Sequence, residues 1–213
     1  MSGNGFDPVS RWASAWGKLG VQPPGAAVRE AVIAAYRSPD RAYHSLQHLG
    51  ECFERLDEAG DGMERAGEVL VALWFHDAIY DTRRDDNEAA SAAWAARVLR
   101  EQGAGDEVVG RVERLVLATR HDRAPETPDE ALLVDVDLAI LGADQARFDE
   151  YEGQVRREYG WVAPADFRAG RRAVLTRFLE RPFLYSTEPF RRRFEAPARA
   201  NLRRALAALE RAG

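Results

Sequence analysis

The 213-residue sequence predicts an all-α protein. No run of alternating β-branched residues is bounded by turn residues, so no segment is typical of a β-strand. Almost every segment instead places apolar side chains at helical spacing, with capping residues in the expected places. No internal repeat and no long flexible linker interrupts this pattern. We therefore expect residues 1–213 to form a single helical bundle domain of roughly eight to ten helices.

Breaks along the chain give the order of these helices. Pro23-Pro24-Gly25 separates the first helix from the second, and Gly60 closes the third as a residue that tolerates a left-handed backbone. We expect helices over the approximate ranges 7–19, 25–37, 44–59, 63–80, 87–103, 107–121, 130–141, 144–160 and 165–180, and from 187 onward.

Several later helices begin beside a short polar side chain, whose oxygen can accept a hydrogen bond from the first turn. The candidates for this role are Asn87, Asp106, Asp129 and Asp144. The polar run 81–86 is expected to form the loop that precedes Asn87.

The most hydrophobic expected helix contains two polar groups. In residues 69–81, VLVALWFHDAIYD, ten of the thirteen side chains are apolar or aromatic, yet His76 and Asp77 lie in the middle. Burying an imidazole or carboxyl group without a partner costs roughly 2–7 kcal/mol. Either the two groups belong to a hydrogen-bonded core pair, or they bind a divalent cation, for which both are good ligands.

Two other hydrophobic helices also carry candidate ligands. His44 and His48 are four residues apart, which places them on one face of a helix, and His48 is in register with Cys52. The helix over 130–141 contains Asp135 and Asp137, which point to opposite sides, so only one can reach a given site. A site of two imidazoles and two carboxylates suits Mn²⁺, Fe²⁺, Ni²⁺ or Zn²⁺ better than Mg²⁺ or Ca²⁺.

The order H…HD…D over successive helices resembles the HD superfamily of metal-dependent phosphohydrolases. The motifs YHSLQH (43–48), WFHDAIYD (74–81), NEAASA (87–92), ATRH (118–121) and DVDLAILG (135–142) are similar to those of one branch of small predicted phosphohydrolases. The resemblance covers roughly residues 7–205. It implies an HD-type helical fold in which the metal ligands are His48, His76, Asp77 and Asp137. Asp137 is preferred to Asp135 because its Asp-Leu pair, followed by small and apolar residues, matches the last motif better.

Three further residues are candidates for roles in catalysis. YHSLQH is similar to the YHNxxH motif of cyclic-nucleotide phosphodiesterases, which implies that His44 is a general acid; alternatively, His44 packs or caps near its helix start. Glu88 is a candidate for orienting the attacking water, or it is an ordinary first-turn acid. His121 can bind a second metal, a phosphate oxygen or the carbonyls at its helix end. Because the chain has only four histidines, we expect one tightly bound metal and at most a second held mainly through Asp77 and water.

The implied function is hydrolysis of phosphate esters by a metal-activated water. The substrate would be a small phosphorylated molecule, such as a nucleotide. Two alternatives stay open: an HD-type di-iron oxygenase, against which the shortage of histidines argues, and a non-catalytic HD module that binds a nucleotide.

Composition limits location and partners. The single cysteine rules out an internal disulfide and a cysteine-rich metal site, and no apolar run approaches the ~20 residues of a membrane span. The first residues lack a basic stretch followed by an apolar one, so we expect no signal peptide and a cytoplasmic location.

Residues 151–213 contain 14 Arg and seven acidic residues. Arginine doublets such as Arg171-Arg172 and Arg203-Arg204 have no aromatic residues interleaved with them, so nucleic acid is not the expected partner. The sequence does not indicate an oligomeric state.

Overall fold

A computed structural model of the chain describes residues 6–60 and 62–211. These residues form ten α-helices and one 3₁₀ helix and contain no β-strand, which confirms the predicted all-α class. The chain divides into two compact units, and the boundary between Leu133 and Val134 falls inside the seventh helix. Among the described helices, none is both long enough and apolar enough to cross a membrane.

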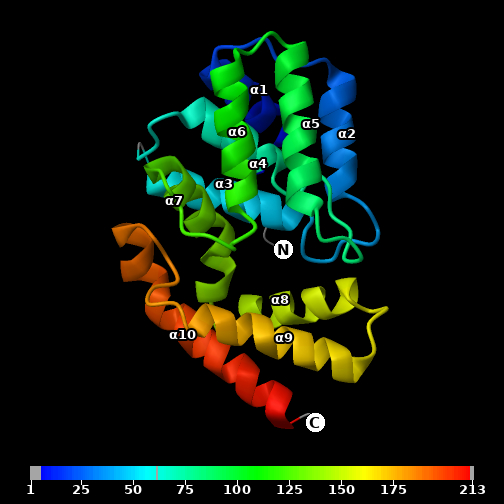
Figure 1. Ribbon diagram of the computed structural model, residues 1–213, viewed down its shortest axis with the longest axis vertical. Helices are drawn as coiled ribbons and strands as arrows, with labels where there is room; N and C mark the ends of the chain where they lie inside the picture. The colour runs from blue at the N-terminus through cyan, green and yellow to red at the C-terminus, as the bar shows by residue number, and fades with distance from the viewer. Residues whose placement is uncertain (1–5, 61, 212–213) are drawn as a thin grey trace. The chain divides into compact units, whose positions relative to one another are not determined.

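The first unit is built around one buried helix. Its elements are α1 (Pro8–Leu19), α2 (Ala26–Tyr36), α3 (Leu46–Ala59), α4 (Ala66–Phe75), α5 (Asn87–Glu101), α6 (Asp106–Ala118) and the start of α7 (Pro128–Asp137). Every residue of α4 from Gly67 to Phe75 is buried, because α1, α3, α5 and α6 all pack against this helix (Figure 1). Such all-round burial explains why α4 has hydrophobic residues on every face rather than along one stripe.

Aromatic side chains fill the space between α1, α3 and α4. The ring of Trp12 lies edge-on to Trp74, with centroids 5.2 Å apart, and Phe53 of α3 contacts the same Trp74 ring at 5.4 Å. Large aromatic side chains supply much of the apolar area that a core of this size buries. This cluster therefore holds the C-terminal end of α4, which precedes His76, against α1 and α3.

Helix α4 ends at Phe75, five residues earlier than the sequence predicts. Residues 76–79 form turns and bends instead, and other parts of the unit satisfy their backbone groups. The Ser91 hydroxyl accepts a hydrogen bond from Ile79 N at 2.9 Å, and the Arg41 guanidinium donates to Asp77 O at 2.6 Å and to Ala78 O at 3.0 Å. These tertiary hydrogen bonds replace those that a longer helix would have made.

The predicted caps are partly correct. Asp144 accepts a hydrogen bond from Arg147 N and caps its own helix as expected. Asp129 instead accepts from Glu64 N at 2.8 Å and Arg65 N at 3.0 Å, so its carboxylate holds the start of α4 rather than of α7. Asn87 lies inside α5, where its amide bonds to the backbone of Asp81.

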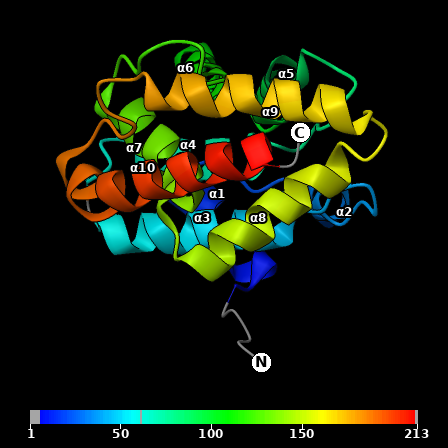
Figure 2. The ribbon, with the colours of Figure 1, turned by 90° about the horizontal axis from the view of Figure 1, so that it is seen from below.

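The second unit contains the end of α7 and the C-terminal helices. These are the 3₁₀ helix η1 (Leu138–Gly142), α8 (Gln145–Glu158), α9 (Pro164–Leu179) and α10 (Glu188–Arg211). The expected helix over 130–141 is thus α up to Asp137 and 3₁₀ beyond it. Helix α10 packs against both η1 and α9, and Figure 2 shows α10 alongside α9. Gly142 permits this packing, since a Cβ atom there would lie 2.8 Å from Phe194 Cβ.

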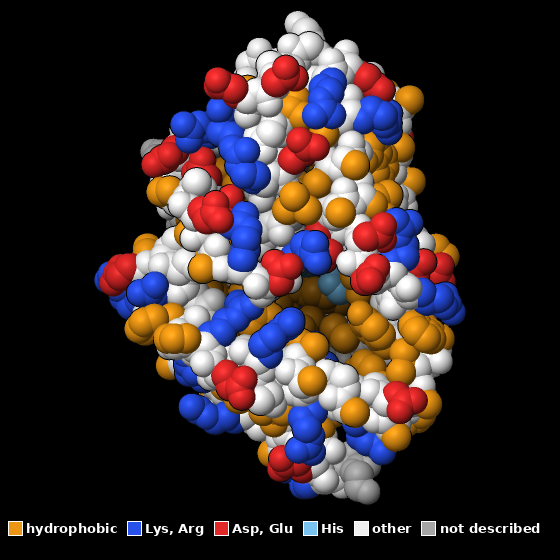
Figure 3. All heavy atoms as spheres, viewed as in Figure 1, with side chains coloured by type: hydrophobic (Ala, Val, Ile, Leu, Met, Phe, Trp, Pro, Cys, Tyr) orange, Lys and Arg blue, Asp and Glu red, His pale blue; other side chains and the backbone are white. Residues whose placement is uncertain are grey.

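Charged side chains of both signs are interspersed over the face that Figure 3 shows. In the second unit, several arginines form ion pairs within that unit: Arg171–Glu152, Arg172–Glu210, Arg192–Glu188, Arg199–Glu195 and Arg204–Asp149. At least five of the 14 arginines in residues 151–213 are therefore paired with acidic groups of the same unit.

Candidate metal centre

The site begins at the start of α3. Ser45 is the N-cap of this helix, and its hydroxyl accepts a hydrogen bond from Gln47 N. His48 and Cys52 follow four residues apart on the inward face, and each is only 2% exposed. His44 precedes the helix, which corrects the expectation that His44 and His48 share one helical face. With Ser45 as the cap, the helix begins at Leu46, two residues after His44.

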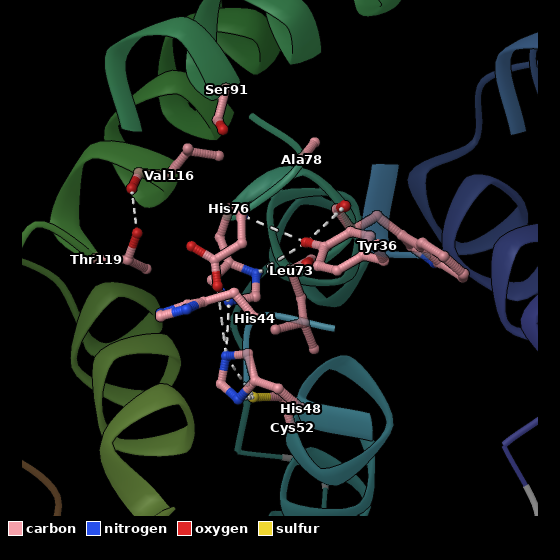
Figure 4. A network of polar contacts seen from close by, with 12 residues as sticks. Tyr36, His44, His48, Cys52, Leu73, His76, Ala78, Ser91, Val116 and Thr119 are labelled. Carbon is pink, nitrogen blue, oxygen red and sulfur yellow. Dashed lines mark hydrogen bonds and ion pairs between the residues drawn. The ribbon is translucent and has the colours of Figure 1, made fainter. Parts of the chain in front are cut away.

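The second part of the site is the turn after α4, which carries His76 and Asp77. The Tyr36 hydroxyl accepts a hydrogen bond from Asp77 N at 3.3 Å and donates to Trp74 O at 3.2 Å. Arg41 binds the carbonyl oxygen of Asp77 from the other direction. The backbone that presents both side chains is thus held at several points (Figure 4).

The side chains of His48, His76 and Asp77 converge. His48 Nε2 and His76 Nε2 are 3.2 Å apart (Figure 4). Asp77 Oδ2 lies 3.0 Å from His76 Nε2 and 3.5 Å from His48 Nε2. Bonds of about 2.0–2.1 Å from one metal ion to two adjacent nitrogens place those nitrogens roughly 2.9–3.4 Å apart. The spacing of the two imidazoles therefore fits two ligands of a single ion.

The tautomer of His76 supports the same conclusion. His76 Nδ1 lies 2.8 Å from the carbonyl oxygen of Leu73, which can only accept a hydrogen bond, so Nδ1 carries the proton. Nε2 is then the ring nitrogen that faces His48 and Asp77, and it offers a lone pair whenever the ring is neutral. Metal-binding histidines are commonly oriented in this way, by a hydrogen bond from the other ring nitrogen.

Asp77 provides negative charge at this point. Burial on its own would raise the pKa of Asp77, but the neighbouring His76 and His48 outweigh it and hold the pKa well below the usual aspartate range. The side chain is consequently a carboxylate, which is the form that binds a cation.

Cys52 is the donor that the sequence interpretation did not assign to the site. Its sulfur and one nitrogen each of His48 and His76 all lie within 4.8 Å of one another. The first unit thus brings together buried His, Cys and His donors that could hold a metal ion. Asp77 lies beside both of these histidines. The only signal in the sequence was the spacing of Cys52 four residues after His48.

The two aspartates of α7 differ in their surroundings. The Asp135 carboxylate accepts hydrogen bonds from Ser186 N, Thr187 N and Thr187 Oγ1, each at 2.7 Å, so it caps the start of α10 within the second unit. Asp135 is therefore committed to a structural role. Asp137 is the last residue of α7 and also belongs to the second unit, and its role as a ligand stays a prediction.

The three residues with predicted catalytic roles all lie in the first unit. The His44 ring stacks on Tyr80, with centroids 3.8 Å apart and planes inclined by 24°, and meets Tyr43 edge-on at 4.9 Å. Its charge also contributes to lowering the pKa of Asp77, which indicates proximity to the converged donors. The role of His44 as an acid stays a prediction.

Glu88 and His121 are neighbours of the same region. Burial raises the pKa of Glu88, and the charge of Asp77 raises it further, whereas the positive charges of Arg120 and His121 oppose the increase. His121 lies just beyond α6 in a left-handed backbone conformation with φ of 57°. Among non-glycine residues this conformation is uncommon and often marks a functional position. The roles of both residues stay predictions.

Comparison of the chain with protein-family models, with curated proteins and with solved structures found no significant match. The resemblance to the HD superfamily thus stays a prediction that rests on the motifs and on the buried donors.

Proposed function

We propose that this protein is a metal-dependent hydrolase that cleaves phosphate ester bonds in a small phosphorylated molecule, such as a nucleotide. The observation that carries the proposal is the convergence of His48 Nε2, His76 Nε2 and Asp77 Oδ2 within 3.5 Å of one another. The order of these residues along the chain, and the motifs around them, resemble metal-dependent phosphohydrolases.

The residues present fit a divalent transition metal such as Mn²⁺, Fe²⁺, Ni²⁺ or Zn²⁺. His48, His76 and Asp77 would hold it, with Asp137 as the predicted fourth ligand. When bound, such an ion supplies Lewis acidity toward phosphoryl oxygens and lowers the pKa of water. The hydrogen bonds of Tyr36 and Arg41 would keep the His76–Asp77 turn in position while substrate binds and leaves.

His44 is suited to donate a proton to the leaving oxygen. Stacking on Tyr80 and edge-on contact with Tyr43 fix the plane of its imidazole, so a ring nitrogen has a defined direction. Histidine is the side chain most often used to transfer protons near neutral pH.

Glu88 is suited to orient the attacking water. Its raised pKa makes it a better proton acceptor than an ordinary glutamate, and its sensitivity to the charge of Asp77 indicates that it lies near the converged donors. An acid and a base with different surroundings beside one site are typical of hydrolytic centres.

The test is a turnover assay of protein loaded with Mn²⁺, Ni²⁺ or Zn²⁺ against a panel of nucleotides and simple phosphate esters. We expect release of phosphate or a nucleoside, and loss of that activity in Asp77→Asn. Asp85→Asn is the matched control, because it makes the same change at an exposed loop position and should retain activity.

The alternatives give different results in the same samples. A ligand-induced rise in unfolding temperature without turnover would indicate a binding module. Oxygen consumption with about two iron ions per chain would indicate an oxygenase. Lack of turnover for every phosphorylated compound with metal fully loaded would contradict the proposal.

A further inference from the structure

Cys52 combines three properties at one place. It is the only cysteine of the chain, it is 2% exposed, and it follows His48 by one helical turn on the face that carries that histidine inward. Its sulfur lies 3.7 Å from His48 Nε2 and 3.6 Å from His48 Nδ1, and Figure 4 shows it beside the His48 ring. The thiol is thus part of the converged group rather than of the aromatic core around Trp74.

We propose that Cys52 is itself a metal ligand, and that its sulfur makes this centre selective for Zn²⁺ over harder cations such as Mn²⁺ and Mg²⁺. The inference rests on the metal centre of the proposed function, but not on the reaction assigned to it.

The spacing of the donors is consistent with sulfur coordination. In a tetrahedral shell, bonds of about 2.3 Å to sulfur and about 2.0–2.1 Å to nitrogen place these two atoms roughly 3.6 Å apart. The separation of 3.7 Å between Cys52 Sγ and His48 Nε2 is close to this value, but the sulfur is equally near Nδ1, at 3.6 Å, so the Cys52 side chain has to rotate toward Nε2 to share its metal ion. The same sulfur lies within 4.8 Å of a His76 nitrogen.

The donor set accounts for the expected selectivity. Two imidazoles, one carboxylate and one thiolate match the nitrogen and sulfur ligands of tetrahedral zinc sites. Mn²⁺ and Mg²⁺ prefer oxygen donors and six-coordinate shells, so replacing an oxygen ligand by sulfur disfavours them. On binding, the thiol proton passes to solvent and the sulfur enters the shell as a thiolate.

Cobalt substitution tests the proposal directly. The visible d–d bands of Co²⁺ report bound metal whatever its ligands, whereas a near-ultraviolet charge-transfer band requires a sulfur–cobalt bond. Because the chain has one cysteine, that band can arise only from Cys52. We expect the full-length protein to show both features when titrated with Co²⁺.

Substitutions sharpen the result. Cys52→Ser and Cys52→Ala should keep the d–d bands and lose the charge-transfer band, and their preference for Zn²⁺ over Mn²⁺ in a competition titration should fall by at least about 10-fold. Asp77→Asn is the matched control. It should weaken Co²⁺ binding but keep the charge-transfer intensity per bound ion.

Two results would overturn the inference. Normal d–d bands without a charge-transfer band would show that the metal binds without Cys52, whose sulfur would then serve as a hydrogen-bond partner of His48 Nδ1. Absence of both the d–d bands and the charge-transfer band in folded protein would show that these residues do not bind Co²⁺, and would contradict the proposed metal centre as well. Turnover of phosphate esters is measured separately, so failure of the reaction would leave the spectroscopic result standing.

Discussion

His48 Nε2 and His76 Nε2 face each other at 3.2 Å in the interior of the first unit. Nδ1 of His76 donates its proton to Leu73 O, so Nε2 is the ring nitrogen that is left to face His48. Two imidazoles and the Asp77 carboxylate at this distance are stabilised most simply by a shared cation.

The first prediction concerns metal binding and stability. Purified protein should contain about one transition metal ion per chain, and His76→Ala should abolish it, because this change removes the ring that contacts both other donors. At a free metal concentration of 100 times Kd, binding stabilises the folded chain by about 2.7 kcal/mol. For a chain of this size, that corresponds to a rise in unfolding temperature of roughly 5–11 °C.

Elemental analysis and thermal unfolding, with and without a chelator, check this prediction. The chelator should lower the unfolding temperature of the natural protein and leave that of His76→Ala unchanged. Equal metal content in the two proteins would place the ion elsewhere.

The second prediction separates the two aspartates of α7. Asp135→Asn should lower the free energy of unfolding by roughly 1–3 kcal/mol, because the half-buried donors of Ser186 and Thr187 lose a buried acceptor that can satisfy them all. Its metal content should not change. Asp137→Asn should show the reverse pattern, a loss of metal affinity with little change in the stability of the metal-free protein.

Metal content and urea unfolding of both variants provide the comparison. Loss of metal from Asp135→Asn, with Asp137→Asn unaffected, would show that Asp135 is the metal ligand and that Asp137 is not.

The all-α class could be predicted because helical periodicity is a local property of the sequence. The end of α4 could not, since a run as hydrophobic as 69–81 gives no internal stop. It ends at Phe75 because Ser91 and Arg41, which are distant in sequence, satisfy the backbone of the following turn. Asp129 shows the same limitation, because its position suggests a cap for α7 whereas its hydrogen bonds are made to the start of α4.

The site was predictable to the extent that ligand chemistry is visible in residue types. His48, His76 and Asp77 stood out as polar groups in apolar segments, and the structure brings them together. Cys52 was overlooked because a buried cysteine is also an ordinary core residue. Tyr36 could not be identified, since only the fold shows that its hydroxyl reaches the backbone beside Asp77.

The third prediction assigns Tyr36 a positioning role. Tyr36→Phe leaves the buried Trp74 carbonyl and the Asp77 amide without a hydroxyl partner. We expect a loss of roughly 1–3 kcal/mol in stability. We also expect metal affinity to fall about 10- to 100-fold, as it does when other residues that position metal ligands through hydrogen bonds are replaced.

Tyr185→Phe is the matched control for this change. Tyr185 is equally buried and donates to Leu138 O at 3.0 Å within the second unit, so its loss should cost similar stability. Metal affinity, measured by calorimetric titration, should fall only in Tyr36→Phe. Equal losses of affinity in both variants would reduce the role of Tyr36 to general stability.

The fourth prediction concerns acid stability and the ion pair of Glu130 with Arg123. Glu130 is 2% exposed and accepts hydrogen bonds from Arg123 Nη1 at 2.8 Å and Glu126 N at 2.9 Å. Burial raises the pKa of Glu130, but these two hydrogen bonds outweigh it, and the pKa lies below its usual value. A carboxylate with a lowered folded-state pKa stabilises the fold at pH values above the unfolded-state pKa, which is about 4.3 for glutamate. That contribution is lost as the pH falls through the folded-state pKa.

Glu130→Gln should therefore destabilise the protein most at neutral pH, by roughly 1–3 kcal/mol. The difference from the natural protein should shrink progressively below about pH 4.3, because Glu130 binds a proton there in the unfolded chain and only at lower pH in the folded one. Urea unfolding at a series of pH values measures this difference. Glu126→Gln is the control, since the Glu126 side chain is 70% exposed and its contact with Arg123 is longer, at 3.5 Å. A Glu130→Gln difference that stays constant from pH 7 to pH 3 would show that the pair does not depend on the charge of Glu130.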